Sequence, residues 1–169
     1  MKVAIACDHI VTDIKDKMVT FLRQAGYEVV DCGTYDFVRT HYPIFGHKAA
    51  SLVATNQVDK AVIMCGTGVG ISNAANKTKN IRAALVRDLI SARQAVEEFN
   101  ANVIAVGGRI TGIGLIEEIY QTFLETKYQP TPAKDARIEK INALITHDNY
   151  ADNIFDSEIQ KWQAGYYHD

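Results

Sequence analysis

Short runs of β-branched and other apolar residues alternate along this chain with longer segments that have the periodicity of helices. The runs that predict strands are residues 2–7, 27–32, 60–65, 81–86 and 102–107. After the first run, apolar side chains recur every three or four positions until Gly26, which is a typical helix stop. Strands that alternate with helices form a parallel sheet with helices on both faces. The sequence therefore predicts an α/β protein with a five-stranded parallel sheet.

Length and composition fit a single domain followed by a short tail. The 169 residues are 47% hydrophobic, which is sufficient for one buried core without disulfides or metals. Helical periodicity continues through Ile138, Ile141 and Ile145, so we expect a domain at residues 1–146 that ends in a C-terminal helix. Residues 147–169 mix acidic and aromatic side chains, and these aromatics favour docking of the tail on a subunit over a frayed end.

Charge and hydropathy exclude several classes of partner. The net charge of −2 comes from interleaved acidic and basic residues without a basic stripe, so we expect no nucleic-acid partner. The apolar runs are far shorter than the roughly 20 residues that cross a bilayer, and no export signal precedes Asp8. We therefore expect a cytoplasmic protein that does not enter membranes.

The cysteines do not have the spacing of a disulfide framework or a zinc site. Cys7, Cys32 and Cys65 are odd in number and widely separated. The chain also has no cluster of His, Cys and carboxylate residues with the spacing of metal ligands. We therefore expect no metal and no cofactor, and each cysteine is considered singly.

Polar and glycine residues gather where the predicted strands end. In an open parallel sheet, ligands bind beyond the carboxyl ends of the strands. The corresponding segments are residues 7–9, 31–43, 65–70, 86–88 and 107–112. We therefore expect the site on this rim of the sheet.

The segment Cys-Gly-Thr-Gly-Val-Gly at residues 65–70 is the strongest candidate on this rim. Its glycines can present successive backbone N–H groups to an anion, but no Lys-Ser/Thr pair follows as in a Walker loop. Cys65 is either a thiolate that removes a proton or a buried thiol at a strand end. The loop and the adjacent Thr67 favour the first interpretation, whereas Cys7 and Cys32 lack such a loop and are interpreted as structural.

Four further polar residues follow predicted strands. Asp8 and His9 can bind sugar hydroxyls or phosphate, or they can cap the following helix, and both interpretations stay open on chemistry alone. Arg39 lies in a long connection and Arg109 at a glycine-flanked strand end. A solvated arginine is the ordinary role for each, but their shared rim favours an anionic ligand.

Five segments together resemble the family of ribose-5-phosphate isomerase B and galactose-6-phosphate isomerase. In chain order they are ACDHIVTDIK, DCGTYDFVRTHYP, CGTGVGISNAANK, IRAALV and NANVIAVGGRITG. The similarity extends from the first predicted strand to about Ile145, and C-G-T-G-x-G followed by A-A-N-K is specific. DHIVTDIK and GTYDFVRTHYPI are most similar to the B subunits of galactose-6-phosphate isomerases.

The resemblance implies a Rossmann-like three-layer sandwich that isomerises a phosphosugar at a subunit interface, without a metal and through a cis-enediol. Cys65 matches the base that moves a proton between C1 and C2, and Thr67 matches the hydroxyl that assists at the neighbouring oxygens. The backbone amides of Gly66, Gly68 and Gly70 would stabilise the enediolate.

The resemblance also assigns residues that bind the substrate. Asp8 and His9 match residues that contact the sugar, and Arg109 matches a phosphate-binding arginine. Arg39 would reach the same ligand. Arg137 matches one of two arginines that bind phosphate in the neighbouring subunit.

The sequence departs from the family in the second half of this shared site. Homodimeric members have a histidine-asparagine pair that opens the sugar ring, and the matching residues here are Glu98 and Phe99. Neither side chain can donate and accept a proton near neutral pH as an imidazole does. The second phosphate-binding arginine is replaced by Ala133, with Lys134 nearby. The resemblance therefore implies a related partner subunit that supplies the missing histidine, asparagine and arginines.

Three functions are consistent with these residues. The first is a subunit of a heteromeric isomerase that interconverts galactose-6-phosphate and tagatose-6-phosphate. The second is an isomerase for ribose phosphate, allose phosphate or another phosphosugar, and the third is a non-catalytic subunit that binds a phosphosugar for regulation. Incorporation of solvent deuterium into the product would distinguish an isomerase from a binding protein.

Overall fold

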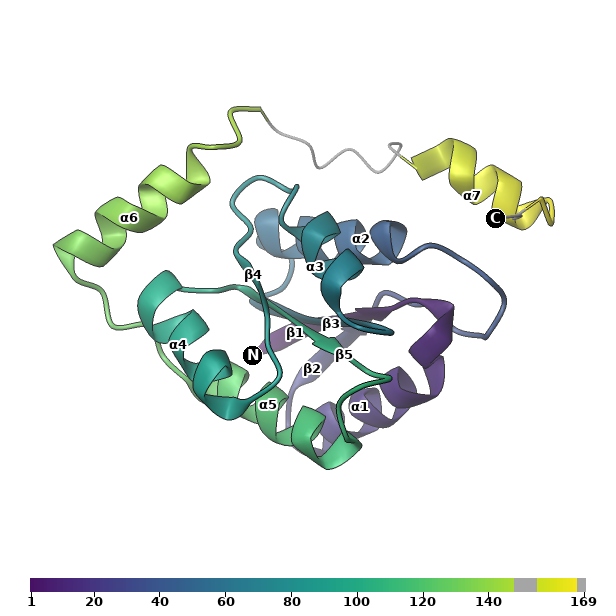
Figure 1. Cartoon of the computed structure of the whole chain (residues 1–169), viewed down its shortest axis with the longest axis horizontal. Coiled ribbons are helices and arrows are strands. Elements are labelled where there is room, and N and C mark those ends of the chain that lie inside the picture. The colour runs from purple at the N-terminus through teal and green to yellow at the C-terminus, as the bar shows by residue number, and fades with distance from the viewer. Residues whose placement is uncertain (148–154, 167–169) are drawn as a thin grey trace.

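The computed structural model describes residues 1–147 and 155–166 and contains a five-stranded parallel sheet (Figure 1). The strand order is β2-β1-β3-β5-β4. The strands are β1 (Lys2–Cys7), β2 (Glu28–Asp31), β3 (Lys60–Cys65), β4 (Ala83–Leu85) and β5 (Val103–Gly107). The predicted α/β class and the five-stranded parallel sheet are confirmed.

Helices cover both faces of this sheet and complete a three-layer sandwich (Figure 1). The helices on one face are α1 (Thr12–Gln24), α4 (Leu89–Phe99) and α5 (Ile113–Glu125), and those on the other are α2 (Tyr42–Ala54) and α3 (Val69–Ala75). A 3-10 turn, η1 (His9–Val11), precedes α1. Two further helices lie outside these layers: α6 (Pro132–Asn142) packs beside α4, and α7 (Asp156–Gln163) packs on α2.

Successive residues of the central strands point to opposite faces of the sheet, as the pleat of a strand requires. In β1, Ile5 and Cys7 face the core formed with α1, α4 and α5, whereas Ala4 and Ala6 face the core formed with α2 and α3. The same alternation in β3 places Cys65 on the α2–α3 side. Cys7 and Cys65 therefore lie on opposite faces of the sheet.

Four predicted elements differ from the structure at one or both ends. The predicted strand at residues 102–107 begins at Val103, and the one at residues 27–32 ends at Asp31. The strand predicted from Tyr27 begins at Glu28, because the N–H of Tyr27 still donates to the carbonyl of Leu22 at the end of α1. The strand predicted for residues 81–86 is limited to Ala83–Leu85, since the N–H of Arg82 donates to the Asn102 side chain at 2.9 Å. The helix expected to reach Ile145 ends at Asn142 in a turn.

The segment expected to be an aromatic tail, residues 147–169, contains the helix α7, which the sequence did not predict. Phe155, Ile159 and Trp162 pack against the core on the α2–α3 side of the sheet. Residues 148–154 and 167–169 of this segment lie outside the described residues.

Candidate active site

The loop that follows β3 is held at the rim by the neighbouring strand β5. Cys65 is the last residue of β3 and lies in register with Gly107 at the end of β5. Beyond this pair, the N–H of Gly108 donates to the carbonyl of Cys65 at 2.9 Å, and the N–H of Arg109 donates to that of Gly66 at 3.0 Å. The sheet ladder thus continues past the strands, and it fixes the backbone of the loop.

The thiol of Cys65 is close to a backbone donor of this loop. The side chain is only 4% exposed, and the N–H of Gly68 donates to its sulfur at 3.2 Å. An amide that points at sulfur can stabilise the negative charge of a thiolate. The geometry is therefore suited to a cysteine that gives and takes a proton.

The other two cysteines have surroundings that disfavour the thiolate. Burial raises the pKa of the Cys7 thiol to about 12 and that of the Cys32 thiol to about 11, although Lys15 and Lys48 respectively oppose these shifts. Both thiols are protonated at neutral pH, and Cys7 faces the opposite side of the sheet. These observations favour the interpretation of both residues as structural.

The loop needs glycine at residue 68. Gly68 has φ of +79°, and a Cβ at this position would lie 2.6 Å from Leu85 Cδ1 and 2.7 Å from the carbonyl carbon of Val106. The side chain of Leu85 could move, but the backbone of β5 could not. Gly68 therefore allows the loop to lie directly on β5.

We expect Gly68→Ala to destabilise the fold by about 2 kcal/mol or more, because left-handed backbone strain adds to the clash with β5. Gly66→Ala is the matched control, since a Cβ at Gly66 would meet no atom within 4 Å. Thermal unfolding of both variants measures the difference. Equal stability of the two variants would contradict the close packing of the loop on β5.

Thr67 lies at the exposed tip of the loop. Its hydroxyl accepts the N–H of Val69 at 3.4 Å, a contact that orients the side chain at the start of α3. The hydroxyl is therefore accessible to a ligand, and the next residue, Gly68, carries the amide that contacts Cys65. Cys65, Thr67 and the loop glycines are together on the predicted rim.

Asp8 and His9 lie at the end of β1 and have structural contacts of their own. Asp8 is buried, and its carboxylate accepts the N–H of Ile10 at 3.1 Å as the cap of η1. Burial raises the pKa of this carboxyl, and Arg109 partly opposes the shift. Nδ1 of His9 lies 3.0 Å from the carbonyl oxygen and 3.2 Å from the amide nitrogen of Thr40. The cap predicted as one alternative for Asp8 is thus present, and His9 anchors the connection between β2 and α2.

Two arginines from different connections are exposed on the same part of the structure. Arg109 extends from the end of β5, and its guanidinium donates to the carbonyl of Ile10 at 3.3 Å. Arg39 directly precedes Thr40, the residue that contacts His9. The structure therefore brings Asp8, His9 and Arg109 to one edge, with the Arg39 segment beside His9.

Arg137 is not part of this group within one chain. It is exposed on α6, which lies on the side of the molecule away from the strand ends that lead into α1 and α3 (Figure 1). Arg137 was predicted to bind phosphate in the site of a neighbouring subunit. Its place on α6 leaves the side chain accessible for this role.

The residues that replace the family's histidine and asparagine lie at the end of α4, next to α6. Lys134 Nζ lies 2.9 Å from a carboxylate oxygen of Glu98 and donates to the carbonyl of Glu97 at 2.9 Å. Phe99 is half exposed and lines a pocket of about 260 Å³ with Ile141. Glu98 is therefore held in an ion pair within its own chain.

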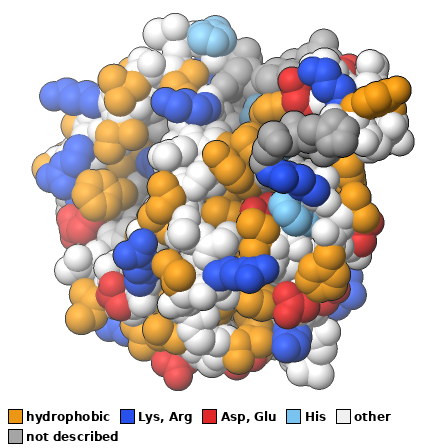
Figure 2. Space-filling model, turned by 45° about the vertical axis from the view of Figure 1, so that its right-hand side comes forward, with side chains coloured by type: hydrophobic (Ala, Val, Ile, Leu, Met, Phe, Trp, Pro, Cys, Tyr) orange, Lys and Arg blue, Asp and Glu red, His pale blue; other side chains and the backbone are white. Residues whose placement is uncertain are grey.

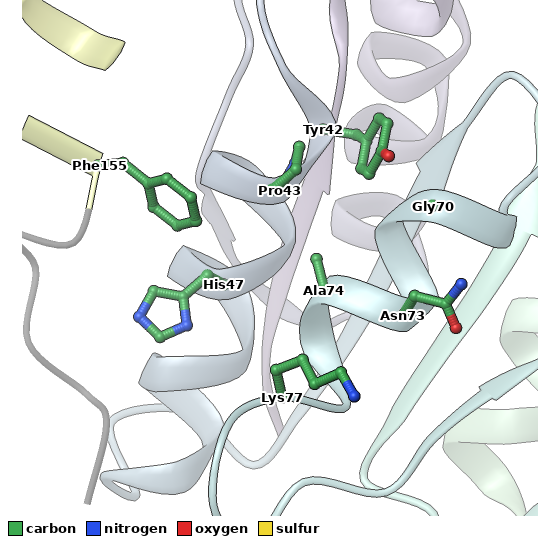
Figure 3. Close-up of a pocket in the computed structure, with 8 residues that line it drawn as sticks. All are labelled: Tyr42, Pro43, His47, Gly70, Asn73, Ala74, Lys77 and Phe155. Carbon is green, nitrogen blue, oxygen red and sulfur yellow. The ribbon is translucent and has the colours of Figure 1, made fainter. Parts of the chain in front are cut away.

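Tyr42 is a residue of the rim that the sequence places in the same long connection as Arg39 and to which it assigns no role. It is the first residue of α2, and a Cβ at Gly70 would lie 2.5 Å from its ring. Tyr42 and Gly70 line a pocket of about 370 Å³ between α2 and α3, together with His47, Asn73 and Lys77 (Figure 3). The sequence signal was the Tyr-Pro pair at a helix start, but the contact with Gly70 is tertiary.

Exposed hydrophobic side chains surround the loop. In Figure 2 the molecule is turned so that the right-hand side of Figure 1 comes forward. On this face, hydrophobic patches are interrupted by single basic residues. The exposed apolar residues near the carboxyl ends of β3, β4 and β5 are Val69, Leu85, Ile90, Ile110 and Ile113. Exposed apolar side chains gathered at the edge of a site are typical of an interface with another protein.

Residues 1–147 and 155–166 contain neither a cluster of metal ligands nor a membrane-spanning helix. No three His, Cys, Asp or Glu side chains come together there as metal ligands. None of the helices in that part of the chain is long and apolar enough to span a bilayer.

Comparisons with known proteins agree with the motifs. The model of the ribose/galactose isomerase family matches residues 3–141. Galactose-6-phosphate isomerase subunit LacB of Clostridium acetobutylicum is 58% identical, over 99% of this chain and 98% of its own. Ribose-5-phosphate isomerase B of Escherichia coli is 38% identical, over 88% of this chain and 99% of its own.

A solved structure, that of ribose-5-phosphate isomerase B from Clostridium thermocellum, has a TM-score of 0.83 and 38% identity, and the match covers 85% of this chain and 97% of that one. Its fold is the Rossmann-like sandwich that the resemblance implied. The chain belongs to the ribose/galactose isomerase family.

Proposed function

We propose that this chain is the subunit of a heteromeric aldose-ketose isomerase that interconverts galactose-6-phosphate and tagatose-6-phosphate. The observation that carries the proposal is the Cys65 thiol, 3.2 Å from the Gly68 amide in a loop of exposed Thr67 and glycines. The substrate class is supported by the relative LacB, whose similarity extends over nearly the whole chain.

In the proposed mechanism, the Cys65 thiolate removes the proton from C2 of the open-chain aldose. The electron pair moves into a C1–C2 double bond, and the carbonyl oxygen O1 becomes an oxyanion of the cis-enediolate. The amides of Gly66, Gly68 and Gly70 stabilise this charge, while the Thr67 hydroxyl assists proton transfer between O2 and O1. The Cys65 thiol then returns its proton to C1, which gives the ketose and regenerates the thiolate.

The remaining rim residues are assigned to binding. Asp8 and His9 lie at the end of β1, where they would contact the sugar hydroxyls. Arg109 and Arg39 offer guanidinium groups, which suit a phosphate ester because they can donate two parallel hydrogen bonds. Tyr42 packs on Gly70 and would close the side of the loop toward α2.

The partner subunit is inferred from what the chain lacks. Glu98 is paired with Lys134, and Phe99 has no proton to exchange, so neither residue is suited to open a sugar ring. The exposed apolar residues around the loop provide a surface on which a related subunit would pack. That subunit would supply the histidine, asparagine and arginines, and Arg137 of this chain would extend toward it.

The proposed function is tested by assaying this chain with its related subunit on galactose-6-phosphate in D₂O. Deuterium on the product's C1 and a loss of the substrate's C2 hydrogen are expected. Ribose-5-phosphate is the second candidate substrate, because ribose-5-phosphate isomerase B is also a relative. Binding of phosphosugars without any exchange would instead indicate a regulatory subunit.

We expect Thr67→Ala to lower turnover by about 10²-fold, as is typical for the loss of one aligned donor at a developing charge. Thr67→Ser retains the hydroxyl and should retain most of the activity. Steady-state kinetics of both variants in the assembled enzyme provide the measurement. An unchanged rate for Thr67→Ala would leave the residue with only its contact to the Val69 amide.

A further inference from the structure

The helix α7 contacts α2 through aromatic side chains. The Trp162 ring meets the ring of Phe45 edge-on, with centroids 6.4 Å apart and planes at 80°. The Phe155 ring lies 5.8 Å from the ring of His47, which is two residues farther along α2 (Figure 3). Ile159 is half buried in the same interface. Edge-on aromatic pairs of this kind are favourable and directional, so α7 holds α2 at defined points.

The helix α2 in turn contacts two segments of the rim. The ring of Tyr42, the first residue of α2, lies against Gly70 of the loop at residues 65–70. One turn later, Phe45 lies against Gly33, where a Cβ would be 3.1 Å from the Phe45 ring. Phe45 is therefore located between Trp162 of α7 and the start of the connection that leads from β2 to the site.

This connection is anchored at its start, at Asp36, whose carbonyl accepts the Thr12 hydroxyl at 2.7 Å, and at Thr40 beside His9. Its start is paired with β1, since the N–H of Cys7 donates to the Gly33 carbonyl at 2.7 Å and the N–H of Thr34 to the Cys7 carbonyl at 3.0 Å. Residues 35–39 are all exposed. The connection then runs past His9 at Thr40 and enters α2. A shift of α2 would therefore move Tyr42 and residues 39–41 relative to the loop at Cys65.

A charged side chain of α7, Glu158, also interacts with the start of α2. The pKa of Glu158 lies below its ordinary value, first because Ser157 donates a hydrogen bond to its carboxylate and in smaller part because Lys161 and His41 are near. Glu158 and His41 therefore interact across the interface between α7 and the end of the connection.

We propose that α7 is a positioning element of the active site, which braces α2 and so sets the location of Tyr42 and residues 39–41 for a hexose phosphate. The substrate preference rests on the proposed function and on how much of this chain each relative matches. The solved ribose-5-phosphate isomerase B structure matches 85% of this chain, whereas the LacB relative matches 99% of it. A hexose phosphate is one carbon longer than a pentose phosphate and so reaches farther across the rim.

Hydrogen exchange of the full-length chain tests the bracing without any assumption about catalysis. In Trp162→Ala, the amides of residues 35–46 should exchange about 10-fold faster, because the edge-on contact with Phe45 is lost. Trp162→Phe keeps a ring at this position and should restore most of the protection. Tyr166→Ala is the matched control, since this aromatic of the same segment is 71% exposed and its removal should change nothing.

The kinetic test uses the enzyme assembled with its related subunit. Trp162→Ala should lower kcat/KM for galactose-6-phosphate by about 10- to 100-fold, the range expected when reacting groups are misplaced by up to an ångström. The loss for ribose-5-phosphate should be smaller by a factor of about ten, and Tyr166→Ala should leave both rates unchanged.

The outcomes separate this proposal from the proposed function. Unchanged exchange at residues 35–46, or faster exchange in every part of the chain alike, would overturn the bracing. Faster exchange at these residues with equal kinetic losses for both sugars would overturn the substrate preference. If neither sugar is turned over by the unmodified assembly, the proposed function fails, and localised exchange in Trp162→Ala would still support the bracing.

Discussion

Replacing Cys65 with alanine should abolish isomerisation while phosphosugar binding persists. The expected loss of kcat is about 10³-fold or more, because a positioned general base contributes roughly 10² to 10⁴ and alanine cannot replace it. Cys65→Ser should be nearly as inactive, since a hydroxyl is a far weaker base than a thiolate. Steady-state kinetics give the loss in turnover, and calorimetric titration with substrate gives the affinity.

The control for this experiment is Cys32→Ala, which removes a buried thiol whose pKa is raised to about 11. This variant should retain turnover even where its melting temperature falls. If Cys65→Ala retained most of the activity in the assembled enzyme, another group would have to carry the proton between C1 and C2, and Cys65 would be a structural thiol at the end of β3.

The isolated chain should have little or no activity on cyclic phosphosugars, at least about 100-fold below the assembly with a related subunit. The reason is the end of α4, where Glu98 is neutralised by Lys134 at 2.9 Å and Phe99 has no exchangeable proton. Mixing with the subunit that carries the histidine and arginines should restore turnover. Rates measured at increasing partner concentration provide the test, and activity should saturate with complex formation.

A variant within the chain gives the matching control. Glu98→Ala in the assembly should leave turnover nearly unchanged, because the carboxylate serves Lys134 and not the sugar. Robust turnover by the isolated chain would contradict the shared site whatever its oligomeric state. It would then require a local group to open the ring, and a large loss in Glu98→Ala would identify that group.

Local signals in the sequence predicted most of the sheet and the centre of the site. The run of residues 60–65 coincides with β3, since apolar β-branched residues between polar ends leave little choice of element. The loop after it was predicted because glycines and a cysteine are adjacent in the chain. Asp8, His9 and Arg109 could be grouped from the rule that parallel strands end at one edge.

What the sequence could not predict depends on contacts between distant segments. α7 is short and has no buried residue of its own. The role of its apolar side chains becomes evident only from the ring contacts with Phe45 and His47 of α2. Tyr42 meets Gly70 across the gap between two helices. The ion pair between Glu98 and Lys134 likewise joins α4 to α6. The periodicity of a sequence does not predict which residues of two helices will pair.

The two hydrogen bonds that carry the ladder beyond β3 and β5 have a consequence for how this scaffold can change its substrate. They join Gly108 to Cys65 and Arg109 to Gly66, so the backbone of the loop after β3 is held by the buried sheet. The exposed part of the connection, residues 35–39, lies outside the sheet and is held by single contacts, such as that of the Thr12 hydroxyl with the Asp36 carbonyl at 2.7 Å. Under the proposed function, proton transfer would belong to the loop held by the sheet and part of substrate recognition to the exposed connection. Sugars of different length could then be accommodated by changes in the connection while the reacting atoms keep their places.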